Sequence, residues 1–118
     1  MRPTLFVVTA LLSFSIIGLA KAADPILLAE TGGFLLGNAQ RCGVPNARVQ
    51  QAGKVLHNVI VSASSDPSEE DAAASRFAAI FMASAYPDRE SAALIPACRI
   101  VIVQFQRLEH HHQQAGMN

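Results

Sequence analysis

The sequence has few of the residues and motifs on which common active sites depend. It contains no tryptophan, one tyrosine, two cysteines and four histidines in 118 residues, and charged residues make up only 15% of it. A Gly-x-Ser-x-Gly nucleophile motif, a Cys-x-x-Cys pair and the glycine-punctuated acidic alternation of an EF-hand loop are all absent. The sequence therefore offers no recognisable hydrolase, dithiol or EF-hand site, and we expect neither an enzyme nor a bound cofactor.

The charge pattern is equally plain. Nine basic residues balance nine acidic residues, and the basic residues do not cluster anywhere along the chain. A nucleic-acid-binding domain needs a concentrated positive patch to meet the phosphate backbone. We therefore expect no nucleic-acid partner.

The amino terminus carries the strongest targeting signal. Met1-Arg2 supplies a positive start, residues 4–20 form an uncharged, mostly apolar run of 17 residues, and Ala20-Lys21-Ala22 is a small-x-small cleavage site. A membrane anchor is the alternative, but a helix needs about 20 mostly apolar residues to span a bilayer. The pattern predicts a signal peptide over residues 1–22, export to the bacterial periplasm or the cell exterior, and no stable membrane span after cleavage.

Cleavage after Ala22 leaves 96 of the 118 residues. This length suits one domain with one core, which we place at residues 23–109, followed by a polar, histidine-containing tail at residues 110–118. Arg2 and Lys21 leave with the signal, so seven basic residues then face nine acidic residues, a net charge of −2.

The two cysteines gain significance from the predicted export, because an oxidising compartment lets cysteines pair. Cys42 and Cys98 are the only candidates, and they are 56 positions apart. Closing a loop of that length stabilises a fold by roughly 4 kcal/mol in the chain-entropy estimate. We predict an intramolecular disulfide between them, with two free thiols or a redox pair as the alternatives.

Capping signals and apolar spacing predict a first helix from Asp24-Pro25 to about Cys42. Gly32-Gly33 interrupts the pattern, so this pair is expected to mark a kink or the true start of a shorter helix. The spacing of Gly33 and Gly37 indicates a place where another helix approaches closely. The expected apolar side consists of Leu28, Leu35, Ala39 and Cys42, flanked by Phe34 and Leu36.

The next two helices have clear starts. A turn at residues 43–46 precedes a helix over residues 47–62, for which Asn46 is the expected cap. Ser65-Asp66-Pro67 and the acidic residues after it predict a third helix over residues 67–86, ended by Pro87. The acidic run itself fits the positive end of the helix dipole and does not require a metal ion.

The most apolar stretch after the signal, Pro96 to Leu108, is predicted to be a fourth helix at the centre of the fold. Its apolar side is Cys98, Val101, Ile102, Phe105 and Leu108, broadened by Ile100 and Val103. The expected fold class is therefore all-α, a small four-helix bundle-like domain with one intramolecular disulfide. The alternative is an α+β fold with a short strand pair at residues 58–62 and 99–104, because both segments are rich in β-branched residues.

Few side chains are candidates for chemistry. His57 is the only histidine in the body of the domain, and no sequence motif supplies it with a nucleophile or an orienting group. The cluster His110, His111 and His112 has imidazole ligands that suit copper, nickel or zinc. Arg99 and Arg107, eight residues apart on the fourth helix, are candidates for the border of an interaction surface, or are solvated arginines that cover apolar neighbours with their stems.

In architecture alone, an exported helical chain of under a hundred residues with one long-range disulfide resembles the small periplasmic acid-stress chaperones of bacteria. No motif carries that resemblance to individual residues. We expect a small exported helical protein that binds another protein, as a chaperone, inhibitor, immunity-type or accessory factor. The alternatives are a periplasmic metal-binding or metal-sequestering protein that uses the histidine cluster, and a small hydrolase whose site the sequence does not reveal.

Overall fold

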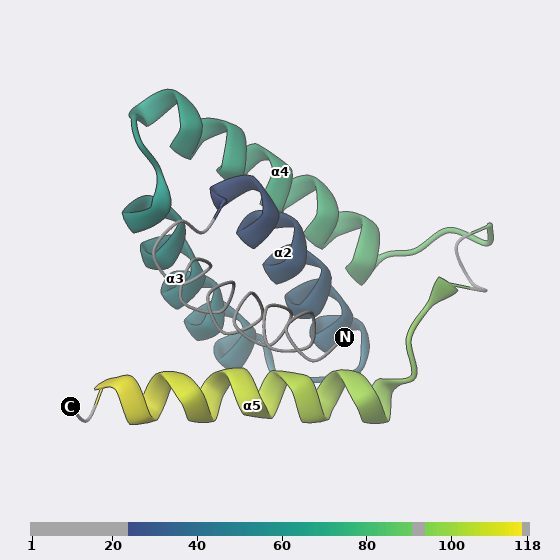
Figure 1. Cartoon of the computed structure of the whole chain (residues 1–118). Coiled ribbons are helices and arrows are strands. Elements are labelled where there is room, and N and C mark those ends of the chain that lie inside the picture. Colours follow the sequence, from purple (N-terminus) through teal and green to yellow (C-terminus); the bar gives the residue numbers. More distant parts are fainter. Residues whose placement is uncertain (1–23, 91–93, 117–118) are drawn as a thin grey trace, which may run out of the picture.

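A computed structural model describes residues 24–90 and 94–116 of the chain, with side chains as far as residue 111. The described part is all-α: α2 (Pro25–Arg41), α3 (Asn46–Ala63), α4 (Pro67–Ala85) and α5 (Cys98–Gly116) form a small bundle-like domain (Figure 1). Both segments of the alternative strand pair are helical, at residues 58–62 in α3 and 99–104 in α5, so the α+β alternative is wrong. The predicted signal peptide, residues 1–22, lies outside the described residues.

Local capping fixes where α2 and α4 begin. The carboxylate of Asp24 accepts a hydrogen bond from the Ile26 N–H at 2.9 Å, and a proline follows in the first helical turn. At α4, Asp66 accepts from the Glu69 N–H at 2.9 Å, and the Glu69 carboxylate accepts from the Ser65 N–H at 2.8 Å. These reciprocal bonds satisfy donors that the first turn leaves without helical partners.

The start of α3 differs from the prediction. Pro45 occupies the cap position without a side-chain hydrogen bond, and Asn46 is the first helical residue, so the predicted Asn46 cap is wrong. The preceding turn is as expected, because Gly43 takes a positive φ of 92° and the Val44 N–H reaches back to the Ala39 carbonyl at 3.0 Å. Glycine adopts this left-handed conformation without the steric penalty of a side chain.

The helix at the centre of the fold is α2, not α5. Figure 1 shows α2 between α3 and α4, with α5 running across the region where α2 ends and α3 begins. Ile100 is 49% exposed and Val103 43% exposed, so the residues expected to broaden the apolar side of α5 face solvent. Only a narrow stripe around the buried Val101 and Phe105 enters the core. The prediction that the stretch from Pro96 to Leu108 is central is therefore wrong.

Glycines place α2 at the centre. The helix is continuous through Gly32 and Gly33, so the predicted kink or later start is wrong. A Cβ on Gly33 would come within 2.8 Å of the Phe77 carbonyl oxygen, and one on Gly37 within 2.5 Å of the Phe81 carbonyl oxygen. The close approach predicted from the spacing of these two glycines is confirmed, and the approaching helix is α4.

The buried side of α2 is consequently a stripe of small residues rather than the leucine-rich side that was expected. Leu28 and Leu35 are only half-buried and Phe34 is exposed. Leu36 and Ala39 belong to the main core with Phe105, whereas Ala29 packs in a second, smaller core with Ile60 and Ala73. Hydropathy predicted that the large apolar residues of α2 would be buried. Close packing of the helices instead buries mainly its small residues.

Candidate functional site

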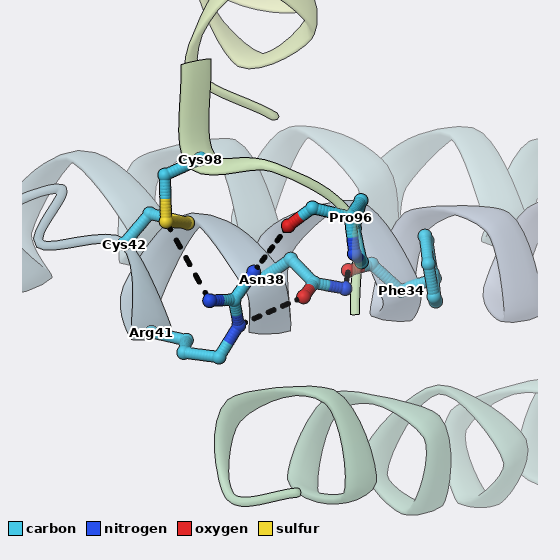
Figure 2. Close-up of a disulfide and its surroundings, with 6 residues drawn as sticks. All are labelled: Phe34, Asn38, Arg41, Cys42, Pro96 and Cys98. Atoms are coloured by element: carbon cyan, nitrogen blue, oxygen red, sulfur yellow. Dashed lines mark hydrogen bonds between the residues drawn. A yellow bond between two sulfur atoms is a disulfide. The ribbon is translucent and has the colours of Figure 1, made fainter. Parts of the chain in front are cut away.

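The predicted disulfide is present and joins the end of α2 to the start of α5. Cys42 and Cys98 have their Cα atoms 5.4 Å apart, within the ordinary range for a disulfide, and both residues are half-buried. Figure 2 shows the disulfide beside the segment that contains Pro96 and leads into α5. The bond therefore fastens the last helix to the central one.

The Arg41 side chain also links the end of α2 to the segment that leads into α5. Its guanidinium donates to the Pro96 carbonyl oxygen at 2.9 Å, to the Asn38 side-chain oxygen at 3.1 Å and to the Cys98 sulfur at 3.5 Å (Figure 2). Asn38 is buried, and its amide group donates in turn to the Phe34 carbonyl oxygen at 2.9 Å. The network holds residues 96–98 against α2 independently of the covalent bond.

No pattern in the sequence predicts this role for Arg41. A basic residue in the last turn of a helix is sufficiently explained by the negative end of the helix dipole. Its three acceptors come from two segments 55 or more residues apart in the chain, so only the fold brings them together.

Arg48 of α3 contacts two residues of α5. The Arg48 guanidinium lies 5.5 Å from the centre of the Phe105 ring and makes two hydrogen bonds to the Glu109 carboxylate, one of them at 3.0 Å. The hydrogen bonds to Glu109 raise the pKa of Arg48 above its usual value, so this side chain stays charged wherever the protein is folded. Arg48 thus covers the outer edge of the buried ring.

An open groove separates α3 from α4. Its main part has a volume of about 630 Å³ and an apolar floor that includes Ile60 and Phe77, and a second part of about 320 Å³ continues towards the start of α3. The two parts share Gln50, Gly53 and Phe77, so they form one continuous depression along the inner side of α3. We call it the α3–α4 groove.

The rim of the α3–α4 groove carries charges of opposite sign on its two walls. Lys54 on α3 and Glu70 on α4 carry these charges, and His57 also stands on α3. Most of the remaining α4 wall is formed by small or apolar side chains such as Ala74. A ligand that fits here presents an apolar surface to the floor and polar groups to the rim.

His57 therefore lies at a ligand-sized groove, although its side chain is exposed. Glu70 is the carboxylate that lines the same groove, and no serine is among the residues that line its main part. The described residues at this groove consequently do not form a base paired with a hydroxyl nucleophile. The expectation that the protein is not an enzyme stays a prediction.

The predicted metal-binding histidines lie in the last part of α5. His110 and His111 are exposed neighbours on a helix that continues to Gly116, and the side chain of His112 lies outside the described residues. Successive helical residues point about 100° apart. Among the described side chains, no group of three or more histidine, cysteine, aspartate or glutamate residues is arranged to hold a metal ion.

Arg99 and Arg107 are both exposed on the outer side of α5, which also carries Ile100 and Val103. The two arginines and these two apolar residues are thus exposed on the same helix, and their role at an interaction surface stays a prediction. None of the described helices is long and apolar enough to cross a membrane.

The α3–α4 groove was not predicted from the sequence. The available signal was Gly53, a position without a side chain among larger apolar residues of α3. Comparison with known proteins adds no assignment: no family model matches the chain, and no curated protein or solved structure shows significant similarity to it.

Proposed function

We propose that this protein binds an amphipathic helix of another exported protein in the α3–α4 groove. The observation that carries the proposal is the groove itself, an open apolar depression between α3 and α4 whose second part is also lined by Leu36 and Gln40 of α2. Grooves of this kind accept the apolar face of a helix, whose side chains at every third or fourth position reach the floor.

The arrangement of the helices supports a helical ligand. In a regular four-helix bundle each helix packs beside two others, and the fourth helix closes the seam between its neighbours. Here α5 runs across the disulfide-linked end and packs on α2 and α3 (Figure 1), whereas the α3–α4 groove leaves the seam between α3 and α4 open. The ligand helix would take the place that a fourth bundle helix normally has.

The rim charges define the ligand further. Lys54 on one wall favours an acidic residue on the side of the ligand helix that faces α3, and Glu70 favours a basic residue on the opposite side. Such charges set orientation and selectivity more than affinity. Affinity would come mainly from burial of apolar surface on Ile60 and Phe77, at about 25 cal/mol per Å².

The test fills the groove without disturbing the fold. A Cβ at Gly53 would have its nearest neighbour, the Leu36 Cδ2, at an ordinary 3.7 Å, so a larger side chain at this position has room to enter the groove. We expect Gly53→Leu to abolish binding and Gly53→Ala to retain most of it. Unchanged thermal stability of both variants would show that the loss is local.

Photo-crosslinking supplies the readout. A benzoylphenylalanine at Ala74, which lines the groove, should capture a protein in cells that produce this chain, and mass spectrometry should map the attachment to an amphipathic helical segment. The same group at Ala79, which is exposed on α4 outside the groove, is the matched control. Equal capture from both positions, or capture at Ala74 that survives Gly53→Leu, would refute the proposal.

A further inference from the structure

We propose that the Cys42–Cys98 disulfide is polarised for thiol exchange, so that an incoming thiol attacks Cys42 and releases Cys98 as the thiolate. The geometry that carries this inference is the unequal environment of the two sulfur atoms. The Arg41 guanidinium donates to the Cys98 sulfur at 3.5 Å, and it is held in that position by the Pro96 carbonyl oxygen and the Asn38 side chain (Figure 2).

A fixed cation beside one sulfur favours negative charge on that sulfur. Thiolates are stabilised next to arginine or lysine, and the thiol that leaves more readily as an anion is the better leaving group in exchange. Arg41 is anchored by two other acceptors, so little reorganisation is needed when charge develops on Cys98. Attack on Cys42 is therefore the easier of the two possible reactions.

The helix termini act in the same direction. Cys98 is the first residue of α5, where the unpaired N–H groups give the helix end a partial positive charge, whereas Cys42 caps the carboxyl end of α2, where the partial charge is negative. A thiolate is favoured at the first position and disfavoured at the second. Two independent features thus assign the same sulfur as the leaving group.

The exchange proceeds in two steps. A thiolate RS⁻ bonds to the Cys42 sulfur, the Cys42–Cys98 bond breaks, and its electron pair goes to Cys98, which leaves as a thiolate beside Arg41. A second thiolate then attacks the external sulfur of the mixed disulfide, releases Cys42 as a thiolate and forms RSSR. The two thiols are oxidised by two electrons in total and the protein disulfide is reduced by two.

The covalent attachment of α5 to α2 is consequently sensitive to thiols. Opening the bond removes the covalent link between the first and last described helices, but the hydrogen bond from Arg41 to the Pro96 carbonyl oxygen does not depend on it. A thiol reductant with an accessible thiolate is the class of partner that this site would react with, and the mixed disulfide would form on Cys42.

The experiment determines which cysteine forms the mixed disulfide. The oxidised full chain is treated briefly with limiting 2-mercaptoethanol, a small thiol with no charged group other than the reacting thiolate, then quenched with acid and alkylated before peptide mass mapping. We expect the mercaptoethanol adduct on Cys42 and the alkyl group on Cys98, in about fivefold excess over the reverse pattern.

Variants of Arg41 assign the cause. Arg41→Gln should lower the excess of the adduct on Cys42 at least twofold. Arg41→Lys should retain more of this excess because the charge stays. Arg76→Gln, at an exposed arginine that pairs with Glu30, is the control and should leave the excess unchanged. Circular dichroism and intact mass confirm that each variant is folded and oxidised. An even distribution in the native protein, an excess of adduct on Cys98, or an excess unaffected by Arg41→Gln would overturn the proposal.

Discussion

Gly37 on α2 lies so close to Phe81 on α4 that a Cβ at Gly37 would come within 2.5 Å of the Phe81 carbonyl oxygen and 3.1 Å of the Ala85 nitrogen. Both atoms belong to the α4 backbone, which cannot turn aside as a side chain can. This contact sets the distance between the two helices. It also explains how α2, which carries glycines on its buried side, packs at close distance against α4.

Replacement of Gly37 by alanine should therefore destabilise the protein. Alanine is favoured over glycine inside a helix by about 1 kcal/mol, but separating α2 from α4 opposes this gain, and overpacking of this kind costs about 1–3 kcal/mol or more. We expect a net loss of up to about 2 kcal/mol in the free energy of unfolding, measured by urea titration. Gly53→Ala is the matched control and should be neutral or stabilising, since its Cβ meets only the Leu36 side chain at 3.7 Å.

Phe105→Ala should be among the most damaging single substitutions on α5. The Phe105 side chain is fully buried in the main core, and removing a buried phenylalanine costs about 3–5 kcal/mol. Val103→Ala, two positions away and 43% exposed, should change the free energy of unfolding by less than about 0.5 kcal/mol. Similar losses from the two variants would contradict the narrow core stripe that we describe for α5.

Removal of the disulfide by replacing Cys42 and Cys98 together with alanine should lower the stability by roughly 4 kcal/mol in the chain-entropy estimate. Because Arg41 still holds the Pro96 carbonyl oxygen, we expect α5 to remain docked in the folded fraction. Hydrogen exchange would report this as retained protection of the α5 amides at low temperature. Adding Arg41→Gln to the double variant should remove that protection selectively, whereas α2 and α4 amides should keep theirs.

Asp66→Ala should weaken the start of α4 by about 1 kcal/mol, the usual value for loss of a helix cap. The carboxylate accepts the Glu69 N–H at 2.9 Å, and alanine offers no acceptor to replace it. Asp71→Ala, at an exposed acidic residue further along α4, provides the comparison and should have a smaller effect. An equal loss from both variants would indicate that the helix dipole, not the cap, accounts for the contribution of Asp66.

Local signals in the sequence placed the helices well because their physical causes act within one turn. Asp24-Pro25 and Asp66-Pro67 supply an acceptor and a fixed φ where a helix must begin, and both starts lie where they were predicted. Asn46 failed as a cap because Pro45 before it already has the extended conformation of the cap position, which makes Asn46 the first helical residue. Such an error moves a boundary and leaves the fold unchanged.

The pairing of Cys42 with Cys98 was also within reach of the sequence, since two cysteines allow one intramolecular bridge. The environment of that bridge was not. Arg41 reaches Pro96 and Cys98 only after α5 has folded back over the end of α2. The α3–α4 groove has the same origin, because its walls come from helices whose separation depends on how each packs on α2.

The sequence by itself thus determined the helical class, the boundaries of α2, α3 and α4 to within a residue or two, and the choice of disulfide partners, because caps, prolines and apolar periodicity act locally. The fourth helix was predicted to end at Leu108, but α5 continues to Gly116. Only the tertiary structure decided that α2 is central, that Ile100 and Val103 face solvent, and that a groove lies open between α3 and α4. Hydropathy measures how strongly a side chain avoids water. It does not measure how closely two backbones can approach, and at Gly33 and Gly37 that distance determined the arrangement.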